Sequence, residues 1–183
     1  MSGNEAHRRL AAGAGAEVRR TGLPFATALA LCALLLASVP KRPLLLWNAS
    51  ASSPIGLYAV GPAHRFSRGD IAVAWAPQQA RRLAATRGYL PSGVPLVKRV
   101  AAVAGANVCA KGAFVVVDGR LAAMRRAFDP SGRPMPWWSG CKRLGPGDAF
   151  LLSATVPDAF DGRYFGVTER TELIGKARPI WRD

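Results

Sequence analysis

The stretch "PLVKRVAAVAG", residues 95–105, decides the fold class, because it is a short apolar run bounded by Pro and Gly. Such runs between turn-forming residues are typical of β-strands. The period-two alternation of a strand places Lys98 on the same face as Leu96 and Val100. The stretch therefore predicts a strand that carries one lysine on an apolar face.

Similar short runs, separated by Gly and Pro, fill the part of the chain that follows Pro43. They predict a mostly β, sandwich- or barrel-like domain. A helix is expected over 77–90, where Pro77 can begin it and Gly88 can end it. Residues 129–141 are too rich in Pro and Gly for a regular element, and an ordered loop is expected there. The other predicted strands are "IGLYAV" (55–60), "DIAVAWA" (70–76), "GAFVVVDGRL" (112–121), "DAFLLSA" (148–154) and "ELIGKARPIW" (172–181).

Residues 23–39 form an uncharged, almost wholly apolar segment. Its length is near the lower limit of about 17 residues for a transmembrane helix, so a cleaved signal peptide remains the alternative. Four arginines precede the segment, whereas only Lys41 and Arg42 follow it closely. Such an excess of positive charge before a membrane segment keeps the N-terminus in the cytoplasm. We therefore expect a cytoplasmic tail over 1–22, a transmembrane or signal-anchor helix over 23–39, and an exported domain over 44–183.

The chain is strongly basic, with a formal net charge of +14 and a pI near 11.2. Nucleic-acid binding proteins usually cluster their cations on one face or helix. Here the cations are scattered, mostly in pairs such as Arg81-Arg82 and Arg125-Arg126. This distribution indicates a solvated surface or attraction to anionic lipid, and no nucleic-acid partner is expected.

Of the three cysteines, Cys32 lies in the apolar segment, and Cys109 and Cys141 lie in the exported part. An oxidising compartment permits a disulfide between the latter two, which would stabilise the domain by about 3 to 4 kcal/mol. Two unrelated buried thiols are the alternative. The sequence has no CxxC or HExxH motif, so neither a metal nor another cofactor is expected.

The stretch "NASASSPIGLY", residues 48–58, gathers three serines in front of Pro and Gly. It is compatible with a plain turn, with a glycosylation acceptor at Asn48, or with a serine nucleophile. A nucleophile needs a base, and His64 stands in a turn-like stretch with no GxSxG motif anywhere in the chain. A lysine buried among apolar groups can lose its proton near neutral pH, whereas an arginine cannot. Lys98 fits this role, and an edge-strand lysine that discourages aggregation is the alternative.

Four segments, in order "SSPIGLY", "RGDIAVA", "PLVKRVAAVAG" and "FDGRYFG", resemble the signal peptidase I family. The similarity is closer to its conjugative-transfer branch, the TraF-type pilin-maturation peptidases. The segment "GRPMPWWSGC" is also typical of that branch. The resemblance covers nearly all of residues 44–181, and it implies a signal-peptidase-like β catalytic domain with one N-terminal transmembrane helix.

The resemblance implies that Ser52 is the nucleophile and that Lys98 is the general base. It implies that the Ser50 hydroxyl helps to bind the oxyanion together with the backbone N–H of Ser52. A hydroxyl that merely caps the turn is the alternative for Ser50. The neighbouring Ser53 is expected to be a bystander.

The chain departs from the family pattern at Ala159, where signal peptidases usually place a serine that orients the lysine amine. Asp161 is therefore the candidate for positioning Lys98, either directly or by pairing with Arg163. The alternative is a purely structural Asp161–Arg163 ion pair.

The implied protein is a serine endopeptidase of the bacterial inner membrane, single-pass, with its catalytic domain on the periplasmic side. Its implied substrate is a pro-pilin or similar membrane-bound precursor for conjugative transfer or type IV secretion. Two alternatives remain, which are a general signal peptidase I and a non-catalytic pilus or secretion assembly factor. Whether water or an amine resolves the acyl-enzyme stays open.

Overall fold

The computed structural model describes residues 22–37 and 45–182, and the chain divides into a unit that ends at Lys41 and a unit that starts at Arg42. In the first unit, α1 extends over Gly22–Ala37. None of the described helices is both long and apolar enough to cross a membrane. The role of the apolar segment as a membrane anchor therefore stays a prediction. The expected cytoplasmic tail, apart from Gly22, lies outside the described residues.

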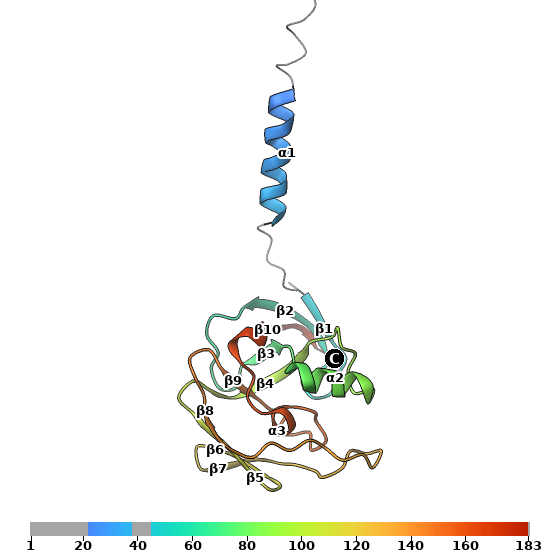
Figure 1. Cartoon of the computed structure of the whole chain (residues 1–183), viewed down its shortest axis with the longest axis vertical. Helices are drawn as coiled ribbons and strands as arrows, with labels where there is room; N and C mark the ends of the chain where they lie inside the picture. Colours follow the sequence, from blue (N-terminus) through green and yellow to red (C-terminus); the bar gives the residue numbers. More distant parts are fainter. Residues whose placement is uncertain (1–21, 38–44, 183) are drawn as a thin grey trace, which may run out of the picture. The chain divides into compact units, whose positions relative to one another are not determined.

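The second unit contains two separate antiparallel sheets, which lie toward opposite ends of the domain (Figure 1). This arrangement confirms the mostly β prediction. Three helical segments accompany the sheets: α2 (Gln78–Thr86), α3 (Gly162–Phe165) and the 3-10 turn η1 (Arg170–Glu172). The six-stranded sheet has the order β1 (Leu45–Asn48), β2 (Gly56–Pro62), β10 (Leu173–Arg182), β3 (Ile71–Ala74), β4 (Leu96–Val103), β9 (Ala149–Leu151). The four-stranded sheet has the order β7 (Arg120–Met124), β6 (Phe114–Val117), β5 (Asn107–Lys111), β8 (Gly140–Arg143).

The six predicted strand runs all contain strands, and "GAFVVVDGRL" forms the β6–β7 hairpin. The structure adds β1, β5 and β8, which the sequence did not predict. All side chains of β8 are exposed, so this strand lacks the alternating apolar pattern that would have revealed it. Backbone pairing with β5 makes it a strand.

The core joins the two sheets through Phe150 of β9, which is fully buried together with Val108 and Val115 of the four-stranded sheet. A second cluster packs β3 and β4 against β9. Strand β4 is thus paired on both edges, with β3 and with β9. Lys98 itself pairs with Ala72 of β3, whereas the pairing with β9 begins at Val100. The side chain of Lys98 is only 5% exposed, which argues against an edge lysine that blocks aggregation.

The predicted helix is confirmed as α2, which follows Pro77 and ends before Gly88. The loop predicted over 129–141 needs a correction, because its last two residues belong to β8. Cys141 faces Cys109 across the β5–β8 pair, and the two cysteines form the predicted disulfide. Cys32 is free and exposed.

Candidate active site

A cavity of about 780 Å³ lies between the serine-rich loop, the start of β4 and the segments 126–135 and 156–160. Ser50, Ser52 and Lys98 are among its lining residues. The fold therefore brings the predicted base, Lys98, to the same cavity as the predicted nucleophile and oxyanion donor of the serine-rich loop.

Asn48, at the end of β1, organises the serine-rich loop. Its side chain is almost completely buried, and Nδ2 donates hydrogen bonds to the carbonyl oxygens of Ser50, Ser53 and Pro54 at 2.9, 3.1 and 3.0 Å. Its Oδ1 accepts the N–H of Ser50 at 3.2 Å. These bonds engage the amide fully, which argues against glycosylation at this residue. Sequence reasoning missed this positioning role, because an isolated Asn beside a turn carries no specific signal.

The other motif residues close the same turn. The hydroxyl of the fully buried Tyr58 donates to the carbonyl of Pro54 at 2.6 Å. Gly56 has a φ of 144°, a backbone conformation that favours glycine. The Ser53 hydroxyl donates to the carbonyl of Val97 at 3.0 Å. The loop is thereby attached to β4 immediately beside Lys98.

Ser52 and Ser50 contact each other directly. Their Oγ atoms are 2.9 Å apart, and the Ser52 N–H donates to Ser50 Oγ at 3.3 Å. The two groups expected to bind an oxyanion therefore lie together, at the nucleophile. Ser52 is half-buried, and Ser50 is exposed on the cavity side.

Lys98 is 5% exposed and lies opposite Ala72 of β3. Burial lowers the pKa of Lys98 from its usual value to about 8, although the nearby Asp161 carboxylate raises it and Arg163 lowers it further. The Lys98 side chain makes no hydrogen bond or ion pair with any other residue that the structure describes. At mildly alkaline pH its amine is therefore neutral and free to accept a proton.

Asp161 is completely buried and pairs with Arg163, which is 2% exposed. Arg163 Nε lies 2.8 Å from Asp161 Oδ1, and Nη2 lies 3.1 Å from Oδ2. The Asp161–Arg163 ion pair is common to the positioning role and to the purely structural alternative, and the effect of Asp161 on Lys98 is electrostatic. Ala159 lines the cavity but offers no hydroxyl to the lysine.

A serine that sequence reasoning missed connects Asp161 to the nucleophile. The Ser153 N–H donates to Asp161 Oδ2 at 2.8 Å, and its hydroxyl donates to the carbonyl of Ser52 at 2.8 Å. Ser153 precedes Asp161 by only a few residues but is 101 residues from Ser52 in the sequence. No sequence pattern could therefore have indicated the contact.

The remaining titratable groups do not extend this site. His64 is exposed and is not part of the cavity lining. Within residues 22–37 and 45–182, no group of three or more His, Cys, Asp or Glu side chains is arranged to hold a metal ion.

Comparison with known proteins identifies the family. Residues 18–181 match the family model "Signal peptidase, peptidase S26". A plasmid transfer protein TraF of Escherichia coli is 35% identical over 159 residues, which cover 81% of this chain and 89% of that protein. A conjugal transfer protein TraF of Agrobacterium fabrum is 34% identical over 144 residues, which cover 73% of this chain and 80% of that protein.

A crystal structure of a signal peptidase I from Enterococcus faecalis also matches, with a TM-score of 0.34 and 17% identity over 61% of this chain and 96% of that chain. So distant a likeness adds nothing to the assignment. The family match and the TraF relatives confirm the resemblance that the sequence motifs indicated. The chain belongs to the signal peptidase family, peptidase S26.

Proposed function

We propose that this peptidase is a membrane-bound serine endopeptidase with a Ser52–Lys98 dyad, and that it processes a pro-pilin or similar exported precursor for conjugative transfer. One observation carries the proposal. Lys98 is buried with its pKa near 8, and it lines the same cavity as Ser52, whose loop is held by an extensive set of hydrogen bonds.

In the proposed reaction, neutral Lys98 takes the proton of the Ser52 hydroxyl while Oγ bonds to the scissile carbonyl carbon. The Ser50 hydroxyl and the Ser52 N–H exchange their mutual contact for hydrogen bonds to the oxyanion. Donors of this kind are worth about 3 to 4 kcal/mol in the transition state. Protonated Lys98 then gives its proton to the departing amine, and water or an amine attacks the acyl-enzyme.

The relatives and the apolar helix support the proposed substrate and location. Proteins called plasmid or conjugal transfer protein TraF align over most of this chain. We infer a precursor from a conjugation or type IV secretion apparatus, with α1 as the inner-membrane anchor and the catalytic domain in the periplasm. A general signal peptidase and a non-catalytic assembly factor are the competing functions.

Cleavage of a pro-pilin by the full chain in detergent micelles tests this function. We expect mass spectrometry to show one cut in a conjugative pilin precursor, and no cut in a precursor of an unrelated exported protein. Equal cleavage of both precursors would indicate a general signal peptidase. Binding of the pilin precursor without any cut would indicate an assembly factor.

The pH dependence of cleavage should report Lys98. A base must be neutral to accept a proton, so kcat/KM is expected to rise with pH up to about 8 and to fall tenfold per unit in acid. His64→Ala serves as the control, because this exposed side chain lies outside the cavity. The variant should keep the same profile. An acid limb that disappears in His64→Ala would contradict the lysine mechanism.

A further inference from the structure

A small hairpin over residues 127–135 forms one wall of the cavity. Its two arms are joined by the Met135 N–H to the carbonyl of Ala127 at 2.8 Å and by the Asp129 N–H to the carbonyl of Arg133 at 2.9 Å. Phe128 and Met135 both line the cavity. This hairpin is therefore an ordered part of the site.

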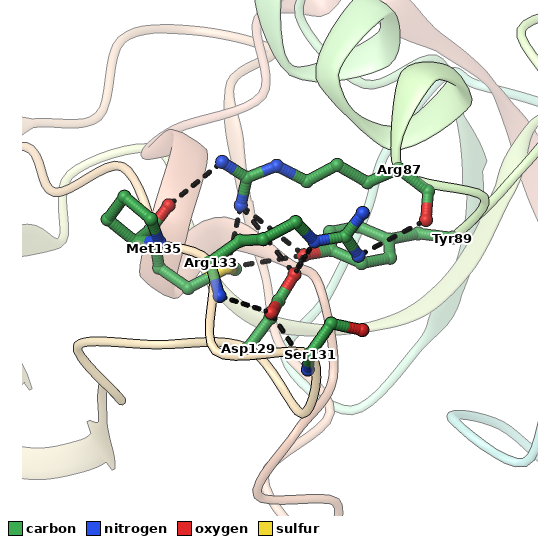
Figure 2. A network of polar contacts seen from close by, with 7 residues as sticks. Arg87, Tyr89, Asp129, Ser131, Arg133 and Met135 are labelled. Atoms are coloured by element: carbon green, nitrogen blue, oxygen red, sulfur yellow. Dashed lines mark hydrogen bonds and ion pairs between the residues drawn. The ribbon is translucent and has the colours of Figure 1, made fainter.

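Asp129 holds the hairpin together from within. Its side chain is only 2% exposed, and Figure 2 shows its carboxylate at the centre of a polar network. It accepts the N–H groups of Ser131 and Arg133 at 3.0 and 2.8 Å, Arg133 Nε at 2.7 Å, and the hydroxyl of Tyr89. Burial alone would raise the pKa of Asp129, but the bonds from Tyr89 and Arg133 outweigh it and lower the pKa. The carboxylate is therefore ionised at every pH where the enzyme would work.

The same network attaches the hairpin to the segment that leads from α2 into β4. Arg87 Nη2 donates to the carbonyl of Pro134 at 2.9 Å, and Arg87 Nη1 lies 3.8 Å from Asp129 Oδ2. The Tyr89 hydroxyl also contacts Met135 Sδ at 3.6 Å (Figure 2). The cavity wall is thus connected to the strand that carries Lys98.

The cavity between these segments is mostly apolar. Phe128 is 58% exposed, although it belongs to the lining, so its ring is available to a bound peptide. Burial of such a ring against an apolar side chain of the peptide favours binding. The other apolar residues of the lining include Leu46, Trp47, Leu90, Val94, Leu96 and Phe160.

We propose that the 127–135 hairpin is a substrate-selectivity element, in which Phe128 and Met135 pack against one bulky apolar side chain of the precursor near the scissile bond. Asp129 acts as a positioning residue, because it fixes this wall to Arg87 and Tyr89 without facing the reacting atoms. The inference rests on the proposed function, since it takes the cavity to be the substrate site.

Peptide binding to the full chain that carries Ser52→Ala tests the selectivity role of the hairpin, because a binding measurement needs no turnover. The probes are short fluorescein-labelled peptides of alanine and serine that carry one phenylalanine at successive positions, compared with the parent peptide that has none. One position is expected to tighten binding about tenfold. Phe128→Ala should abolish this preference. Phe114→Ala, which removes a similarly exposed ring on β6 outside the cavity, should retain it.

Asp129→Asn tests the positioning role. In the Ser52→Ala chain, the phenylalanine preference should drop at least fivefold, and in the active chain KM should rise while kcat stays within about twofold. Asp118→Asn is the control, because its exposed carboxylate also accepts a backbone N–H but lies outside the cavity. Near-ultraviolet circular dichroism checks the fold of each variant.

The failures of the two proposals are distinguishable. If the Ser52→Ala chain still cut a pilin precursor, the proposed nucleophile would be wrong. If no phenylalanine position tightened binding, or if Phe128→Ala kept the preference, the hairpin proposal would be wrong. A lower melting temperature of Asp129→Asn with unchanged peptide preference would leave Asp129 purely structural and would overturn its positioning role.

Discussion

Ser52→Ala and Lys98→Ala are each expected to lower kcat/KM for precursor cleavage by at least about a thousandfold. The first removes the attacking oxygen, and the second removes the base that activates it. Lys98→Arg should be equally inactive, because a guanidinium stays protonated and cannot accept a proton. Cleavage followed by mass spectrometry measures all three variants.

The chain offers a matched control for this prediction in Ser53→Ala. Its hydroxyl donates to the carbonyl of Val97, and loss of one such bond costs about 1 kcal/mol of stability. Substantial activity should remain. If Ser53→Ala were inactive and Ser52→Ala active, the nucleophile assignment would be off by one residue.

Lys98→Met separates the catalytic role of the lysine from its effect on folding. Because burial lowers the pKa of Lys98 to about 8, the folded state disfavours its charged form. Below pH 8 this costs about 3 kcal/mol, and the cost disappears as the pH rises toward the ordinary lysine value of 10.5. Lys98→Met should therefore be inactive but more stable than the parent at neutral pH. Lys111→Met, at an exposed lysine, should change neither property.

Asp161→Asn is expected to lower the free energy of unfolding by about 3 to 5 kcal/mol, because it leaves Arg163 buried without a counter-charge. Turnover should fall further than the loss of folded protein explains, since Asp161 also holds Ser153, which holds the carbonyl of Ser52. Denaturant unfolding and kcat on the same preparations measure the two effects.

The pH profile of Asp161→Asn gives a readout that a structural role would not produce. The Asp161 carboxylate raises the pKa of Lys98, and Arg163 lowers it. Without the carboxylate the lysine pKa should fall, so the acid limb of kcat/KM should move to lower pH. An unchanged limb, with activity that merely follows stability, would show that Asp161 is purely structural.

Two further variants complete this comparison. Ala159→Ser is expected to be tolerated and to keep or raise turnover, since it restores the hydroxyl that signal peptidases usually place there.

Glu169→Gln is the control for the stability of Asp161→Asn. It removes the carboxylate of an exposed ion pair with Lys142 and should lower the free energy of unfolding by less than about 1 kcal/mol. If Glu169→Gln lost as much stability as Asp161→Asn, burial would not explain why the Asp161–Arg163 pair is expected to matter more than the exposed pair.

The sequence by itself determined the elements whose signal is local. Strand β4 was predictable as a short apolar run between Pro95 and Gly105, and α2 from Pro77 and Gly88, because these signals act through the backbone of neighbouring residues. The disulfide was predictable because only two cysteines lie outside the apolar segment. The order and spacing of the motifs were sufficient to indicate the family.

Only the tertiary structure decided how Lys98 loses its charge and how Ser52 is held. Alternation predicted an apolar face, but the 5% exposure of Lys98 depends on elements distant in the sequence, such as β3 and the segment with Asp161 and Arg163. The contact of Ser153 with Ser52 joins residues 101 positions apart. The Asp129 network likewise joins a proline-rich loop to the segment before β4. Desolvation and long-range hydrogen bonds arise from residues that meet only in the folded chain, so no local pattern encodes them.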